Sequence, residues 1–365
     1  MLNNWLRPVS TQLIKGIHEL AGDRLGKKIL VYKDDLPDLK KVKIAIIGID
    51  NVEADKVRKS LYKLSFPFQK LAIADLGNIR KKDHSFLVPV IEELVTSGIF
   101  PVIIGKNAES VIAQFLAYQS QGQLVNLACV DETIRYSFDS EKTVLNQIAD
   151  KKKSHLFNLS FIGFQSHFVS PKVISVFEDN NYDCIRLGKA KTALDQLEPV
   201  IRDADLLSFN LASIKQSDAP VVKDASPNGF FADEACQICR YAGMSEKLTS
   251  IGFYGFESKL DQNQQTAQVV AQLIWYFLDG FYNRKNDFPV STKSLVEYIV
   301  ESKGNDFQVR FWKSSKSGRW WMQVPTKTDR KLKRHRLVPC SYSDYQLACR
   351  EDIPDRLLSA FKRFA

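Results

Sequence analysis

The sequence predicts an α/β protein whose large domain has three layers, with helices on both faces of an eight-stranded parallel sheet, and a small C-terminal β-hairpin and helix appendage. Short, continuous apolar runs recur up to about residue 290, and stretches with helical periodicity separate them. Runs that are apolar throughout are typical of strands buried on both faces, and parallel strands need helical crossovers. After residue 290 both the pattern and the charge change.

Residues 1–40 are predicted to form an N-terminal arm. One short amphipathic stretch at 11–21 is the clearest periodic segment in it. A helix of that length is marginal by itself, so we expect the arm to pack on the large domain or on a neighbouring subunit. The beginning of the chain does not have the basic segment, apolar core and cleavage site that a secretory leader requires.

The large domain is predicted to span residues 41–290. Helical segments such as 90–96 and 264–283 lie between its strands, and the apolar stretch 269–278 is too short for a membrane span. The predicted strands read VKIAIIGI (42–49), LAIADLGNI (71–79), IFPVIIG (99–105), LVNLACV (124–130), LFNLSFIGF (156–164), YDCIRLG (182–188), ADLLSFNL (204–211) and LTSIGFYGF (248–256).

A basic appendage is predicted for residues 291–365. Alternating residues at 307–311, a turn at 314–318 and a returning run at 319–324 indicate a β-hairpin, and one helix is expected over about 343–364. The appendage contains 16 Lys and Arg against 8 Asp and Glu, so it carries +8 of the net charge of +9.

The composition of this appendage suggests a binding surface. Lys and Arg with interleaved aromatics suit contact with nucleic acid. Tryptophans in a hairpin more often form a small core, and Trp and Arg are the usual anchors of protein interfaces, so a protein partner with an acidic surface is favoured. The candidate contacts are Trp312, Trp320, Trp321, Lys331, Lys333, Arg334 and Arg336.

Six cysteines are spread thinly along the chain and form no disulfide pattern, which predicts a cytoplasmic protein. Cys236 and Cys239 have the spacing of a CxxC pair, but they lie on one face of a predicted helix and there is no second pair. Core packing is therefore favoured over zinc or redox chemistry. Neither of the common phosphate-binding glycine patterns occurs.

Four segments at predicted strand ends are the candidate site, because ligands of α/β proteins bind where strands run out into loops. They read IGKNAES at 104–110, VDETIR at 130–135, SFNLA at 208–212 and FYGFES at 253–258. In their order and spacing they resemble the signatures of the ureohydrolase family, which includes arginase, agmatinase and formimidoylglutamase. The resemblance covers roughly residues 40–285, is nearest to the formimidoylglutamase branch, and implies the three-layer arginase-like fold.

Members of this family activate water between two manganese ions, which carboxylates and imidazoles hold. The resemblance implies that most of these ligands are missing here, and that the chain uses neither metal nor catalytic residues. The family's substrate-binding glutamate matches Gly255, with Glu257 two residues further on, and of its Gly-Pro-x-x-Ile-Arg stretch only Val57 and Arg58 are matched. The positions that match the six metal ligands hold Ala108, Asp131, Thr133, Arg135, Asn210 and Ala212.

An uncompensated carboxylate in such a pocket is unfavourable, so Arg135, with Lys106 as a second candidate, is expected to fill the metal cavity by pairing with Asp131. The alternative is that Arg135 turns outward to solvent.

The resemblance thus implies a non-catalytic scaffold or partner-binding protein of the bacterial cytoplasm, without cofactor, that forms a homo-oligomer, as family members do. It also implies an association with bacterial gliding or protein-secretion machinery. Two alternatives remain: an active hydrolase of formimino or guanidino compounds with an atypical site, and an anion-binding adaptor that acts through residues 291–365.

Overall fold

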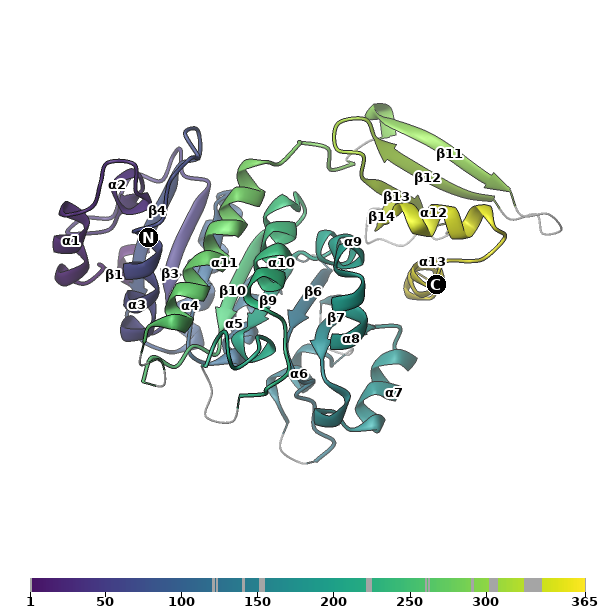
Figure 1. Cartoon of the computed structure of the whole chain (residues 1–365), viewed down its shortest axis with the longest axis horizontal. Helices are drawn as coiled ribbons and strands as arrows, with labels where there is room; N and C mark the ends of the chain where they lie inside the picture. Colours follow the sequence, from purple (N-terminus) through teal and green to yellow (C-terminus); the bar gives the residue numbers. More distant parts are fainter. Residues whose placement is uncertain are drawn as a thin grey trace.

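A ten-stranded sheet forms the centre of the large domain, and a four-stranded sheet with two helices forms the C-terminal appendage (Figure 1). The computed structural model describes residues 2–119, 122, 124–139, 142–150, 155–220, 225–259, 261, 263–289, 292–301, 308–324 and 337–364.

Each of the eight predicted strands is present, and they pair in parallel in the order β4-β3-β5-β10-β9-β6-β7-β8. The predicted three-layer parallel architecture is therefore confirmed. Their bounds are β3 (Ile44–Gly48), β4 (Ile73–Ile79), β5 (Phe100–Ile104), β6 (Val125–Val130), β7 (Leu156–Phe164), β8 (Asp183–Arg186), β9 (Leu206–Asn210) and β10 (Ser250–Tyr254).

The N-terminal arm is part of the same sheet. Its strand β1 (Leu6–Arg7) pairs antiparallel with β4, and β2 (Leu30–Val31) pairs in parallel with β4. The predicted amphipathic helix is α1 (Thr11–His18), and a single turn, α2 (Leu25–Lys28), follows it. The arm thus packs on the large domain of its own chain.

Helices cover both faces of the large sheet, and each face has its own apolar cluster. One face is covered by α3 (Asn51–Leu61), α8 (Leu187–Thr192), α9 (Leu197–Arg202), α10 (Ala232–Met244) and α11 (Gln265–Tyr282). The other is covered by α4 (His84–Thr96), α5 (Val111–Gln119), α6 (Val144–Ile148) and α7 (Pro171–Asp179). No helix in the described part of the chain is long and apolar enough to span a membrane.

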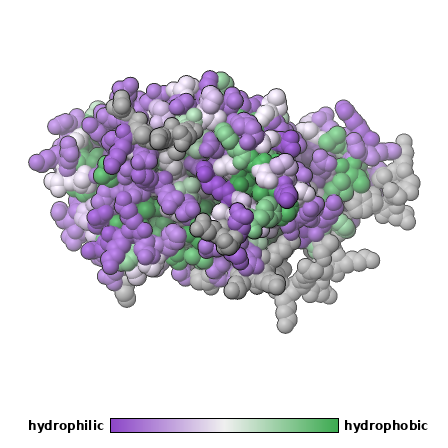
Figure 2. Space-filling view, turned by 90° about the horizontal axis from the view of Figure 1, so that it is seen from below, coloured by the Kyte–Doolittle hydropathy of each residue, from purple (hydrophilic) through white to green (hydrophobic). Residues whose placement is uncertain are grey.

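The carboxyl ends of the parallel strands point to the lower edge of the molecule in Figure 1. Figure 2 looks onto this edge and shows patches of hydrophobic residues within a mostly hydrophilic surface. Since loops that follow parallel strands meet at their carboxyl edge, this is the face on which the candidate site is expected.

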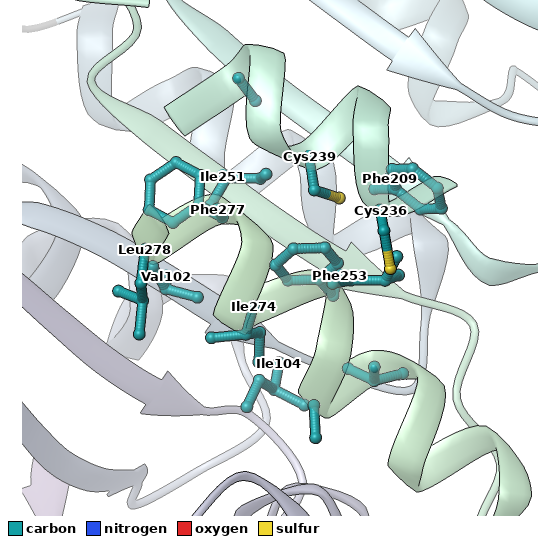
Figure 3. Packing of buried hydrophobic residues seen from close by; sticks show 14 of the residues in the cluster. Val102, Ile104, Phe209, Cys236, Cys239, Ile251, Phe253, Ile274, Phe277 and Leu278 are labelled. Carbon is teal, nitrogen blue, oxygen red and sulfur yellow. The ribbon is translucent and has the colours of Figure 1, made fainter. Parts of the chain in front are cut away.

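Cys236 and Cys239 of α10 belong to the apolar cluster between α10, α11 and the sheet, together with Phe209, Phe253 and Phe277 (Figure 3). Burial raises the pKa of the Cys236 thiol to about 12 and that of Cys239 well above its ordinary value. Both are therefore neutral, apolar side chains, and the prediction of core packing is confirmed.

Arg58 of α3 is fully buried and forms a network with β4. Its Nε donates to Asp75 Oδ2 at 2.8 Å, its Nη1 to Asn78 Oδ1 at 2.7 Å and its Nη2 to the carbonyl of Gly77 at 2.5 Å. Burial favours the neutral guanidine, but Asp75, Tyr62 and Asp55 together outweigh burial and raise the pKa of Arg58 above its ordinary value. The network therefore ties α3 to the sheet through a charged pair that no solvent reaches.

The appendage contains the predicted hairpin, β12 (Gln308–Ser314) and β13 (Trp320–Gln323), and two further strands. The strands β11 (Leu295–Glu301) and β14 (Leu337–Cys340) were not predicted, and they extend the antiparallel sheet on either side. Its core is a separate apolar cluster that includes Phe311 and Met322.

The prediction of a single helix over about 343–364 was wrong. The structure has two helices there, α12 (Tyr342–Cys349) and α13 (Asp355–Phe364). Glu351 adopts a positive φ of 66°, which ends the first helix, and Pro354 disfavours helical backbone at the residue before it.

Arginines make several of the contacts by which the appendage docks on the large domain, and Arg319 of the appendage, 3.3 Å from Glu198 Oε1, is one of them. Arg202 of α9 donates to the carbonyl of Trp320 at 3.1 Å, and its guanidinium lies 4.6 Å from the ring centre of Trp321. Arg363 of α13 donates to Asn158 Oδ1 at 2.6 Å and lies 3.3 Å from Asp183 Oδ2. The contact of Arg363 holds α13 against β8, the strand at that edge of the large sheet.

Candidate functional site

The four candidate segments meet at the carboxyl edge of four adjacent strands. They follow β5, β10, β9 and β6, which are neighbours in that order in the sheet. The loops that the motif spacing selects are therefore brought together by the strand order.

Asn210 and Asp131 are hydrogen-bonded across the end of β9 and β6. Nδ2 of Asn210 donates to Asp131 Oδ2 at 3.0 Å, and Oδ1 of Asn210 accepts from the backbone N–H of Ala212 at 3.2 Å. Ala212 lies in a 3-10 turn, η5 (Leu211–Ser213), which Asn210 caps. Both ends of the amide are thus occupied within the protein.

Arg135 pairs with Asp131, as expected, but only loosely. Its Nη2 lies 3.7 Å from Asp131 Oδ1 and 3.9 Å from Glu132 Oε1, and its side chain is 51% exposed. Burial raises the pKa of Asp131, and Arg135 and the hydrogen bond from Asn210 offset part of that rise. The expected pairing with Asp131 is present, but the guanidinium is half exposed and does not fill the pocket, because a cavity of about 310 Å³ remains beside Asp131.

Lys106 does not pair with Asp131, which corrects the second expectation. Its Nζ donates to Glu257 Oε1 at 2.8 Å, and this hydrogen bond raises the pKa of Lys106. Lys106 follows β5, three strands away from β6 in the sheet, which corresponds to about 14 Å. Glu257 follows β10, the neighbour of β5, and is within reach.

The remaining motif positions contribute neither a carboxylate nor an imidazole. Ala108 begins a 3-10 turn, η2 (Ala108–Ser110), and Thr133 donates its hydroxyl to the carbonyl of Phe168 at 3.2 Å. Gly255 has a φ of 89°, and a Cβ built on it would lie 2.4 Å from Asn210 Oδ1. A longer side chain at 255 would therefore require Asn210 to move.

The donor set at this edge does not fit two manganese ions. A binuclear site needs several carboxylates and imidazoles, whereas the six matched positions contain one carboxylate, one amide, one guanidinium, one hydroxyl and two alanine methyl groups. Within the residues that the structure describes, no group of three or more His, Cys, Asp and Glu is placed to hold a metal ion.

A cavity of about 310 Å³ lies beside Asp131, between the sheet and helices α5 and α6. Its walls include Leu127, Leu145, Ile148 and Phe161. Sequence reasoning did not find it, because these residues belong to strands and helices whose patterns are those of ordinary core elements.

A second cavity, of about 450 Å³, is lined by Lys106 and is more polar. Asp50 is 5% exposed there; its Oδ1 lies 2.5 Å from Lys82 Nζ, and its Oδ2 accepts from the backbone N–H of Lys106 at 2.9 Å. Asp50 follows the first strand of the domain, which is the one signal that sequence reasoning had for it.

The candidate partner contacts differ in their exposure. Trp320 and Trp321 are buried, and Trp312 is half-buried and donates to Gln323 Oε1 at 3.1 Å. Of the three tryptophans, Trp312 is therefore the most accessible to a partner. The other predicted contacts, Lys331, Lys333, Arg334 and Arg336, lie outside the described residues.

No family model and no curated protein matches this chain. Among solved structures, it is similar to a formiminoglutamase of Trypanosoma cruzi with two Mn2+ ions, at 17% identity and a TM-score of 0.61, over 72% of this chain and 99% of that one. The formimidoylglutamase of Bacillus subtilis matches at 15% identity and a TM-score of 0.58, over 69% of this chain and 94% of that one. An agmatine ureohydrolase of Thermoplasma volcanium matches at 16% identity and a TM-score of 0.56, over 73% and 97%. These likenesses, together with the eight parallel strands and the adjacent motif loops, show that the chain has the ureohydrolase (arginase-like) fold.

Proposed function

We propose that this protein is a non-catalytic, metal-free relative of the ureohydrolases that acts in the cytoplasm by binding another protein. The observation that carries the proposal is the contact between Asn210 and Asp131. The one carboxylate left at the six ligand positions accepts a hydrogen bond from an amide that also caps its own loop. An amide in this role holds the loops together without a cation.

Electrostatics at Arg135 supports the same conclusion. A metal ion beside Asp131 would lie close to a guanidinium whose Nη2 is 3.7 Å from the same carboxylate. Two unit charges 4 Å apart repel by about 4 kcal/mol at an effective dielectric of 20, and a dication doubles this figure. Binding would require Arg135 to swing away and Asn210 to release the carboxylate.

The appendage is the surface that we propose for the partner. Its outer strand β11 pairs with β12 on one side, and Val296 and Ile299 on it are 48% and 50% exposed. An edge strand with exposed apolar side chains is a template for a partner strand. A component of bacterial gliding or secretion machinery, or a second copy of this chain in a homo-oligomer, would be a partner of this kind.

Metal analysis and activity assays on the full chain test the proposal. The purified protein, incubated with excess Mn²⁺ and then dialysed, should retain no stoichiometric manganese. It should release neither formamide from N-formimino-L-glutamate nor urea from arginine or agmatine. If it retains two manganese ions per chain and releases either product, the alternative of an active hydrolase replaces this proposal.

A further inference from the structure

The cavity beside Asp131 has the size and the walls of a small-molecule site. Its volume of about 310 Å³ exceeds the roughly 150 Å³ that suffices for benzene in an apolar cavity, and it falls at the lower end of ligand pockets. A ring of benzene size with a short side chain would therefore fit without displacing the walls.

The interior of the cavity is apolar. Leu127 and Cys129 of β6 and Phe161 of β7 line it from the sheet, and Leu145 and Ile148 of α6 face them. Burial raises the pKa of the Cys129 thiol well above its ordinary value, so this side chain is neutral as well. Such walls favour an apolar body over a polar or charged one.

The charged residues that line the cavity are two carboxylates and one guanidinium: Glu109, Asp131 and Arg135. Their formal sum is negative. Arg135 is half exposed and Glu109 is exposed, whereas the side chain of Asp131 is only 13% exposed. Asp131 is therefore the charged group that a ligand inside the cavity would contact.

Two of the contacts to Asp131 Oδ1 are long. It lies 3.4 Å from the backbone nitrogen of Thr133 and 3.7 Å from Arg135 Nη2, whereas charge-assisted N–H···O bonds are about 2.7–2.9 Å long. Asn210 occupies the other oxygen at 3.0 Å. The backbone N–H of Glu132 also donates to this carboxylate. An ammonium group at about 2.7–2.9 Å would lie closer to Oδ1 than Thr133 and Arg135 do.

We propose that this cavity binds a small organic cation, with its ammonium group on Asp131 Oδ1 and an apolar ring or branched chain between α6 and the sheet. This site goes beyond the proposed partner binding and does not depend on it. A buried carboxylate at the mouth of an apolar cavity recognises both halves of such a molecule. A single positive charge also requires the half-exposed Arg135 to move outward, but it is repelled half as strongly as a dication and leaves the hydrogen bond from Asn210 to Oδ2 in place.

Three probes with the same phenylethyl body and different head groups test the proposal: 2-phenylethylamine, 2-phenylethanol and 3-phenylpropanoate. Titration calorimetry on the full chain should show the amine binding about tenfold or more tightly than the alcohol, with the carboxylate weakest, because a hydrogen bond to a charged group adds this much. Equal affinity for amine and alcohol would overturn the ammonium contact, and absence of binding by all three would overturn the site.

Two substitutions separate the head group from the body. Asp131→Asn should lower the affinity for the amine about tenfold and leave the affinity for the alcohol unchanged. Binding of the alcohol therefore also shows that the cavity is intact. Leu145→Phe should weaken both probes by filling the cavity. As a matched control, Glu132→Gln removes a neighbouring carboxylate that does not line the cavity and should alter amine affinity by about twofold or less. If this control lowers amine affinity as much as Asp131→Asn does, the assignment to Asp131 is wrong.

Discussion

Asn210 Nδ2 donates to Asp131 Oδ2 at 3.0 Å, across the ends of two adjacent strands of the large sheet. An amide and a carboxylate attract at this distance, whereas two carboxylates without a cation repel. The residue at 210 therefore decides whether these loops can close without a metal.

Asn210→Asp should destabilise the protein by about 1–3 kcal/mol near pH 7, because it places two buried carboxylates in contact. The loss should shrink as the pH falls and one of the two becomes protonated. Urea unfolding at about pH 7 and pH 5 measures both effects. Asn210→Ala is the control: it removes the hydrogen bond without adding charge, so a pH dependence of equal size in it would contradict the explanation.

Restoring the donor set should restore metal binding. The fivefold variant Ala108→His, Thr133→His, Arg135→Asp, Asn210→Asp and Ala212→Asp supplies imidazoles and carboxylates at the ligand positions. It should retain manganese after dialysis, measured by elemental analysis. A fourfold variant that keeps Arg135 should bind it at least about tenfold more weakly, because the guanidinium repels the ion. Equal retention by the two variants would show that Arg135 does not oppose a metal.

Removal of Arg135 should make the stability of the protein depend more strongly on pH. The folded pKa of Asp131 is already raised by burial, and Arg135 offsets part of that rise. A group whose pKa is raised by folding favours the folded state below its unfolded pKa, and this stabilisation is lost as the pH rises through the folded pKa. Arg135→Met should therefore lower the free energy of unfolding more at about pH 7 than at about pH 4. Thermal unfolding across this range measures the difference, and a uniform loss would contradict it.

Acid should release α13 from the large domain. Burial by itself would raise the pKa of Asp183, but Arg363 and the hydrogen bonds from Asn158 and Ser160 outweigh it and lower that pKa. A lowered pKa contributes stability above the unfolded value, and this contribution is lost as the pH falls through the folded pKa. The protection of the α13 amides against hydrogen exchange, corrected for the pH dependence of the intrinsic exchange rate, should therefore fall below about pH 4.

Arg363→Met should release α13 at neutral pH as well. This variant leaves Asp183 without its cation, which costs about 1–3 kcal/mol. The matched control is Lys362→Met on the same helix, whose side chain is exposed, and it should leave exchange unchanged. If exchange in α13 is insensitive to both acid and Arg363→Met, the ion pair does not hold the helix.

Arg58→Met should destabilise the large domain by about 3–5 kcal/mol, because Asp75 would remain buried without its cation. The double variant Arg58→Met and Asp75→Leu should recover part of this loss. Guanidinium-induced unfolding measures both. The exposed Lys63→Met is the control and should change stability by less than about 0.5 kcal/mol.

The eight strands of the large domain could be predicted because each is a continuous apolar run, and burial on both faces leaves that mark on a few consecutive residues. The hairpin of the appendage also has a recognisable local sequence pattern, whereas β11 and β14 do not. The helix break at Pro354 was readable in principle, since proline restricts the residue before it.

The sequence alone also determined which side chains stand at the matched ligand positions, from Ala108 to Ala212, because identity and spacing are properties of the chain. The tertiary structure decided what those side chains do. It paired Lys106 with Glu257 rather than Asp131, since strand order places β5 beside β10 and away from β6. It also left a cavity beside Asp131, between α6 and the sheet. A cavity depends on how far apart packed elements lie, and the sequence of one element does not contain the distance between α6 and the sheet.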